Sequence, residues 1–145
     1  MAEFTDTIDI AAPPAVVFDL LTTPSGLAKW MGVPIGVDAS PSGAFAVDIA
    51  GYPVRGRYTV VDRPTHVAFT WGFAGSDDLP PGASTVEFRL TGTDDGTRVE
   101  LLHRDLPDQQ VAGHARGWRH YLPRLVVVGS GGDAGPDHWG HDVHD

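Results

Sequence analysis

Hydrophobic and polar residues alternate along five successive segments in the middle and second half of the chain. The segments are 43–50, 53–64, 66–73, 84–92 and 96–106. In each of them the apolar side chains fall on one face, as Val67 and Phe69 do in the third. This period of two predicts consecutive strands of an antiparallel sheet with one apolar face. Turn-rich pieces at 50–53 and 92–97 predict hairpins, and 74–83 predicts a longer exposed loop.

The same alternation in "FTDTIDIAAP", residues 4–13, predicts one further strand that ends at two prolines. Proline suits the first turn of a helix, and apolar residues at helical spacing follow, so we expect a helix over residues 13–22. A second short helix follows, with Ser25 as its cap and Trp30 on its apolar side. The predicted order is therefore one strand, two short helices and five strands.

A long amphipathic helix is expected after the last strand, beginning near Gln109 with Asp108 as its N-cap. At about 100° per residue, the segment "HARGWRHYLPRL" separates into two faces. The apolar and aromatic face carries Val111, His114, Trp118, Tyr121, Leu122 and Leu125. The opposite face carries the basic residues Arg116, Arg119, His120 and Arg124. We interpret this second face as solvated.

Two glycines, Gly113 and Gly117, lie along an edge of the apolar face of this helix. Each costs about 1 kcal/mol relative to alanine in a soluble helix. Their presence indicates either the close approach of a neighbouring backbone or room left for something else. Pro123 lies inside the pattern and is expected to bend the helix around residues 119–122, which would help it to grip a curved sheet.

A sheet that curls around this helix need not fill its interior, so a cavity is expected between the concave face and the helix. The residues expected to line it are Trp30, Phe45, Tyr58, Phe69, Trp71, Phe88, His103, His114, Trp118 and Tyr121. An ordinary packed core is the alternative explanation of the same aromatic set.

His103 and His114 are the polar residues expected to point inward. A histidine there could hold a ligand hydroxyl or carbonyl, or act as an acid or base near neutral pH. The alternative is a histidine at the rim or one satisfied by the backbone, because no carboxylate accompanies either at a recognisable spacing. Phosphate-loop, nucleophile-elbow and zinc-protease motifs do not appear in the sequence. We therefore name no catalytic residue and expect no cofactor.

The composition of the chain limits the classes of molecule that are expected to bind it. The chain has 145 residues, and we expect one domain at 1–128 and a tail rich in Gly, Asp and His at 129–145. No cysteine is present, which excludes disulfides and thiolate metal sites. The formal net charge of -9 disfavours nucleic acid and anionic membranes as partners. The sequence contains no secretion signal and no apolar run of roughly 18 residues, so we expect a cytoplasmic protein.

The tail contains histidines and aspartates at short spacing. They are Asp137, His138, His141, Asp142, His144 and Asp145. On a helical turn this spacing could bind zinc or nickel. The glycines of the tail argue against a stable helix, so we expect an exposed terminal segment and no metal site.

The order of elements and four segments resemble the START-like helix-grip fold of the SRPBCC superfamily, in its branch related to the activator of the heat-shock protein 90 ATPase. The resembling segments are 8–32, 56–73, 84–107 and 114–125. In the last segment, residues that match the family's C-terminal helix pattern are His114, Gly117, Trp118, Leu122 and Leu125. The resemblance implies an α+β fold in which a curved antiparallel sheet of about six strands wraps around the long helix.

Members of this superfamily commonly enclose an apolar cavity that binds lipids, polyketides or flavonoid-like aromatics. The resemblance therefore implies a small hydrophobic ligand, with binding expected rather than catalysis. Two alternatives stay open: a cyclase- or hydrolase-type enzyme that uses a pocket histidine, and a chaperone-associated interaction module. An exposed strand edge or helix face could also support a homodimer.

Overall fold

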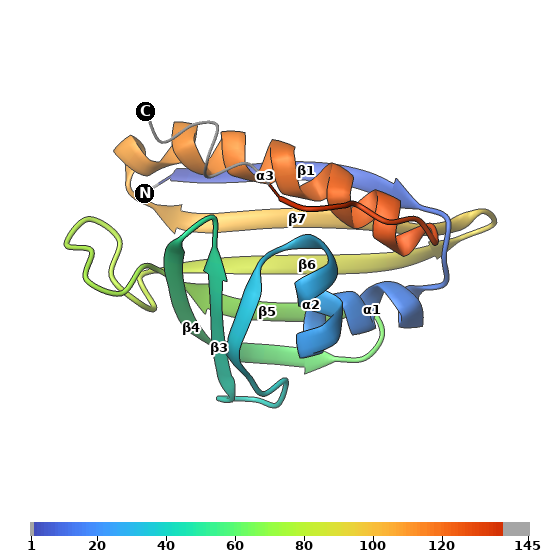
Figure 1. Ribbon diagram of the computed structural model, residues 1–145, viewed down its shortest axis with the longest axis horizontal. Coiled ribbons are helices and arrows are strands. Elements are labelled where there is room, and N and C mark those ends of the chain that lie inside the picture. The colour runs from blue at the N-terminus through green and yellow to red at the C-terminus, as the bar shows by residue number, and fades with distance from the viewer. Residues whose placement is uncertain (1, 138–145) are drawn as a thin grey trace.

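One antiparallel sheet and three helices form the protein, whose residues 2–137 are described by a computed structural model (Figure 1). In chain order the elements are β1 (Ala2–Ile10), α1 (Pro14–Thr22), α2 (Pro24–Trp30), β2 (Val33–Val37), β3 (Ala44–Ile49), β4 (Tyr52–Asp62), β5 (His66–Trp71), β6 (Ser84–Thr93), β7 (Gly96–Leu106) and α3 (Asp108–Gly129). The strand order in the sheet is β1-β7-β6-β5-β4-β3-β2. The expected α+β helix-grip architecture is confirmed. Within the described range, no helix is long and apolar enough to cross a membrane.

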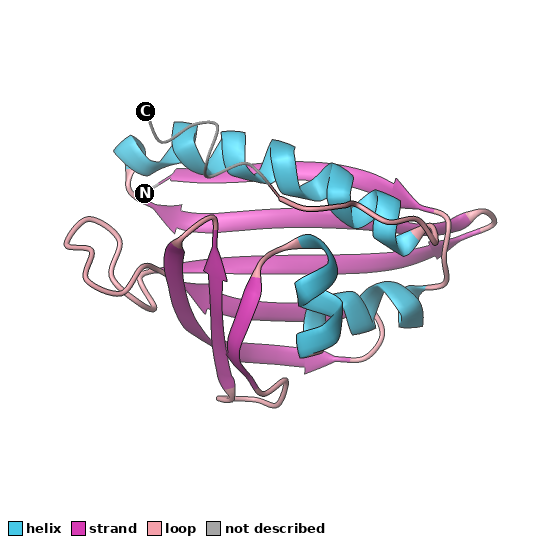
Figure 2. Ribbon diagram, in the orientation of Figure 1, coloured by secondary structure: helices cyan, strands magenta, loops and turns pink. Residues whose placement is uncertain are grey.

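The sheet bends through β4, so that β2 and β3 run across the direction of β5, β6 and β7 (Figure 2). Two features of β4 accompany the bend. The pairing register with β5 shifts between Tyr58 and Val60, as in a β-bulge, which increases local twist. Gly56 lies against the Thr70 carbonyl, and an added Cβ would be only 1.8 Å from that oxygen. The bend thus depends on a glycine that lets two backbones approach closely.

The sheet has seven strands rather than the expected six, because β2 was missed. Its sequence, "VPIGV", contains a proline and a glycine, which are both depleted in strands. Val33 and Ile35 are also exposed, at 63% and 57%, so no buried face produces an alternating pattern. β2 lies at the edge of the sheet and pairs only with β3, which is where a strand tolerates proline.

Two predicted helix caps are wrong by one or two residues in the sequence. Thr23, not Ser25, caps α2, because the Thr23 hydroxyl accepts a hydrogen bond from the Gly26 amide at 3.0 Å. Asp108 is the first residue of α3 rather than its cap, and Pro107 occupies the cap position. α3 continues as one helix through Pro123 to Gly129.

The alternating positions predicted to be apolar are buried in β3, β5, β6 and β7, as for Val47, Val86 and Leu101. The exception is the second half of β4. There the register shift exchanges the faces, so Val61 rather than Val60 packs against the core. The hairpins at 50–53 and 92–97 are confirmed by the pairs that close them, Ile49 with Tyr52 and Thr93 with Gly96.

Two large aromatic residues join α1 to α2 and to the sheet. The Trp30 indole N–H donates to the Leu20 carbonyl at 2.8 Å, and the Tyr58 hydroxyl donates to the Leu21 carbonyl at 3.0 Å. Both carbonyls belong to the end of α1, where a helix leaves acceptors without internal partners. Burial raises the pKa of Tyr58 far above its ordinary value, so it stays a neutral donor.

Residues 130–137 return along α3 (Figure 1). The Arg124 guanidinium donates to the carbonyls of Trp30, Ala134 and Gly135 at 3.0–3.2 Å. The Asp137 carboxylate accepts hydrogen bonds from the Tyr121 hydroxyl and from His120. Arg124 and His120 therefore hold this segment, and their interpretation as part of a solvated face was wrong.

Candidate ligand-binding pocket

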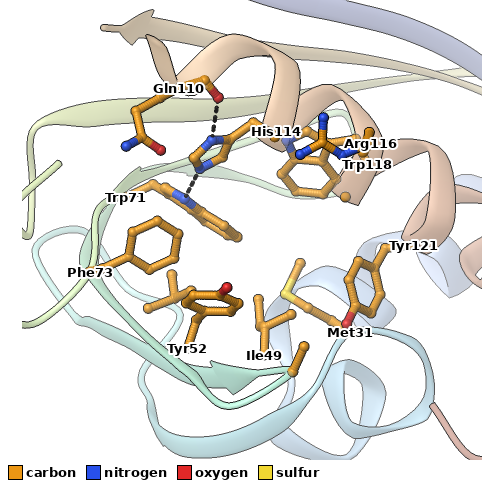
Figure 3. A pocket seen from close by; sticks show the side chains of 14 residues that line it. Met31, Ile49, Tyr52, Trp71, Phe73, Gln110, His114, Arg116, Trp118 and Tyr121 are labelled. Carbon is orange, nitrogen blue, oxygen red and sulfur yellow. Dashed lines mark hydrogen bonds between the residues drawn. The ribbon is translucent and has the colours of Figure 1, made fainter. Parts of the chain in front are cut away.

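A cavity of about 300 Å³ lies between α3 and the part of the sheet where it bends (Figure 3). Four parts of the chain supply its walls: the residue after α2, the hairpin joining β3 to β4, the end of β5, and α3. The lining residues are Met31, Ile49, Ala50, Tyr52, Val54, Trp71, Phe73, Gln110, Gly113, His114, Arg116, Gly117, Trp118 and Tyr121. Tyr52, Gly113 and Arg116 are solvent-exposed and mark the mouth of the pocket.

Gly113 and Gly117 of α3 leave room for the cavity. A Cβ added at Gly117 would meet no atom within 4 Å, and one added at Gly113 would meet only an Arg116 nitrogen, at 3.8 Å. No neighbouring backbone therefore approaches them. The sequence left two interpretations of these glycines open. The structure supports the one in which they leave room for another molecule, and not the one in which a neighbouring backbone approaches closely.

Aromatic rings form the inner wall of the pocket. The ring centroids of Trp71 and Trp118 are 5.5 Å apart, and those of Trp71 and Phe73 are 6.4 Å apart. Tyr52 extends the wall toward the mouth, with its ring 5.5 Å from that of Phe73. Such a surface favours a flat apolar molecule, because offset and edge-to-face ring contacts add to area burial.

His114 is held by two neighbours that determine its protonation. Its Nδ1–H donates to the Gln110 carbonyl at 2.8 Å, since a carbonyl can only accept. Its Nε2 accepts from the Trp71 indole N–H at 3.2 Å, since an indole can only donate (Figure 3). Burial lowers the pKa of His114, against the opposing effect of the Gln110 carbonyl. His114 is therefore a neutral imidazole with both nitrogens in use.

His103 lies behind the two indoles and is held in the same way. Its Nδ1 accepts from the Trp118 indole at 3.0 Å, and its Nε2–H donates to the Ser84 hydroxyl at 2.9 Å. The Ser84 hydroxyl in turn donates to the Trp71 carbonyl at 2.9 Å. Burial, and to a smaller extent the nearby His114, lower the pKa of His103 well below its ordinary value.

Together these bonds form a network that fixes the two tryptophans of the wall. The described residues include no carboxylate hydrogen-bonded to either histidine, so neither has the orienting partner that a general base uses. The arrangement provides shape and apolar contact. Among the described residues no group of three His, Asp or Glu could hold a metal ion. His138, His141 and His144 lie outside the described residues.

Four of the predicted lining residues surround the pocket: Trp71, His114, Trp118 and Tyr121. The other six do not line it and pack in the core: Trp30, Phe45, Tyr58, Phe69, Phe88 and His103. The Phe45 and Phe69 rings, for example, stack with centroids 3.9 Å apart. The middle of the concave face is thus filled by side chains, and the cavity lies where the sheet bends away from α3. Participation of any of these residues in binding stays a prediction.

Sequence reasoning missed the residues that come from the bend and from the mouth. They include Met31, Ile49, Tyr52, Phe73, Gln110 and Arg116. Phe73 continues the alternation of β5, so its pattern contained a usable signal. The sequence contained no such signal for Tyr52 or Arg116, because Tyr52 lies in a predicted turn and Arg116 on a predicted solvated face.

Comparison with known proteins assigns the chain to a family. Residues 11–129 match the model of the activator of Hsp90 ATPase homolog 1-like proteins. An AHSA1-like protein from Rhizobium etli is 40% identical, with a TM-score of 0.74 over 94% of this chain and 86% of that chain. No curated protein matches the chain in sequence.

Two further solved structures share the fold at lower identity. DynU16, a protein in the dynemicin biosynthetic locus, is 22% identical with a TM-score of 0.77, over 93% of this chain and 50% of that chain. The Aha1 dimer from Colwellia psychrerythraea is 21% identical with a TM-score of 0.73, over 91% and 98%. The family model and the 40% identical relative show that this chain belongs to the activator of Hsp90 ATPase homolog 1-like family, as the sequence resemblance implied.

Proposed function

We propose that the protein binds a small, flat, hydrophobic molecule in the pocket between α3 and the bend of the sheet. The observation that carries the proposal is an aromatic-walled cavity of about 300 Å³ that stays open where two glycines of α3 provide no side chain. This volume lies at the lower end of the roughly 300–1,000 Å³ of small-molecule sites. A ligand of two or three fused rings suits this size.

The aromatic walls of the pocket are held in position before any ligand binds. The indoles of Trp71 and Trp118 are already fixed by hydrogen bonds to His114 and His103, so little side-chain freedom would be lost on binding. The proposal is in keeping with a structural neighbour, DynU16, which is a protein in the dynemicin biosynthetic locus. Enzymatic activity and a chaperone-associated role stay the alternatives that the sequence left open. A possible homodimer, a cytoplasmic location and the exclusion of nucleic-acid and membrane partners stay predictions of the sequence.

The test is a cavity-filling variant. Gly117→Leu places a side chain in the pocket at a position where Cβ meets no atom, and leucine has a better helix propensity than glycine. We expect bicyclic and tricyclic aromatics to raise the melting temperature of the wild type and to quench its tryptophan fluorescence. Gly117→Leu should remain folded and lose both responses.

Ala112→Leu is the matched control, because Ala112 lies on α3, is exposed and does not line the pocket. This variant should keep the ligand response of the wild type. The proposal is wrong if no compound in the panel stabilises the wild type, or if Gly117→Leu binds as well as Ala112→Leu.

A further inference from the structure

Arg116 differs from the other arginines of the chain. Eight of the nine arginines make an ion pair, a hydrogen bond or a cation–π contact with a described residue. Arg116 makes none of these contacts within residues 2–137. Its guanidinium lies over Gly113 at the pocket mouth, where one nitrogen is 3.8 Å from the position of an added Cβ.

The same residue is the one charged side chain that lines the pocket, since His114 is neutral. Every other lining residue is apolar, aromatic or an uncharged polar residue. Gln110, six residues before Arg116 on α3, also lines the pocket (Figure 3). The guanidinium of Arg116 carries several N–H donors, and the amide of Gln110 adds two more elsewhere on the pocket lining.

We propose, resting on the proposed function, that the ligand is an aromatic acid whose carboxylate is bound by Arg116 at the mouth while its rings lie against Trp71 and Trp118. A guanidinium fork matches a carboxylate in geometry and charge, and such charge-assisted bonds are stronger than neutral ones. The whole protein has a formal charge of -9, which disfavours anions at a distance. Acceptance of an acid therefore depends on this local cation.

The experiment compares two ligands of matched shape, 2-naphthoate and its methyl ester, at pH 8. Wild-type protein should bind the acid about tenfold more tightly than the ester, the effect of one charge-assisted contact at an exposed rim. Arg116→Gln should lower the affinity for the acid about tenfold and leave the affinity for the ester unchanged. Dissociation constants come from titrations of tryptophan fluorescence.

Arg119→Gln is the matched control, because it removes the same charge from the same helix at a residue that lies over Phe4, away from the pocket. This variant should keep the wild-type preference. The inference is overturned if the wild type binds ester and acid equally, or if Arg119→Gln loses as much affinity as Arg116→Gln. Binding of the ester without preference for the acid leaves the proposed function intact, whereas binding of neither ligand contradicts the proposed function as well.

Discussion

Single hydrogen bonds determine how the pocket wall is held. Each indole N–H of Trp71 and Trp118 donates to a ring nitrogen of a buried histidine. The remaining nitrogens of those histidines donate to the Gln110 carbonyl and to the Ser84 hydroxyl. Because both histidines are neutral, the network satisfies buried polar atoms without placing a charge beside an apolar ligand.

Ser84 is the residue of this network that tests it most directly. Ser84→Ala would leave the Nε2–H of His103 and the carbonyl of Trp71 without this partner in the core. We expect a loss of about 1–3 kcal/mol in the free energy of unfolding, the usual effect of a buried donor left unsatisfied. Urea denaturation followed by fluorescence measures it. The exposed Ser40→Ala should change stability by less than about 0.5 kcal/mol, and equal effects of the two variants would argue against the network.

At the scale of elements, α3 combines two different uses of glycine. Gly117 faces the open pocket, with no atom within 4 Å of an added Cβ. Gly129, the last residue of α3, meets β1 instead, and an added Cβ would be 2.5 Å from the Ile10 Cγ2 atom. The first glycine makes room for a ligand, and the second allows the helix to reach the sheet.

This contrast predicts opposite effects of the same substitution. Gly117→Ala should raise the free energy of unfolding by about 0.5–1 kcal/mol, because alanine loses less backbone entropy in a helix. Gly129→Ala should lower it by about 1–3 kcal/mol, because the buried Ile10 cannot move away without disturbing the core. Thermal and urea unfolding of both variants provide the measurement. Stabilisation by Gly129→Ala would contradict the packing described for the end of α3.

At the scale of the whole molecule, buried ionisable groups lie on both faces of the sheet. His103 and His114 lie on the concave side. Glu87 lies in β6, forms ion pairs with Arg89 and Arg104, and is hydrogen-bonded to His66. Burial alone would raise the pKa of Glu87, but the hydrogen bond from His66 and the charges of these three partners together lower it. Each of the two sets makes stability depend on pH.

We expect stability to fall in two steps on acidification. The pKa values of the two histidines lie below 6.5 in the folded state, so below pH 6.5 the unfolded chain binds more protons and stability falls. The contribution of Glu87 is present above pH 4.5 and is lost as the pH falls through its lowered folded pKa. Urea unfolding between pH 8 and pH 2 measures both steps. Histidine ring signals in NMR that titrate normally for residues 103 and 114 would refute the first step.

The strands of alternating pattern and the amphipathic long helix could be predicted because each buries one face, and burial on one face produces a regular period in the sequence. β2 could not, since Val33 and Ile35 are exposed and no period results. The pocket was predicted only in part. Trp71 and Trp118 follow from the apolar faces of β5 and α3, whereas Tyr52 and Arg116 reach the pocket through the bend of β4 and the orientation of α3.

The amino-acid sequence by itself determined the order of elements apart from β2, the apolar face of each predicted element apart from the second half of β4, and the family, because these depend on local periodicity and on residue types in a motif. Only the tertiary structure decided which aromatic residues fill the core and which face the cavity. Both groups have the same period and the same hydrophobicity. They are separated by the place where the sheet turns away from α3, which depends on contacts between residues far apart in the chain, such as Gly56 with Thr70.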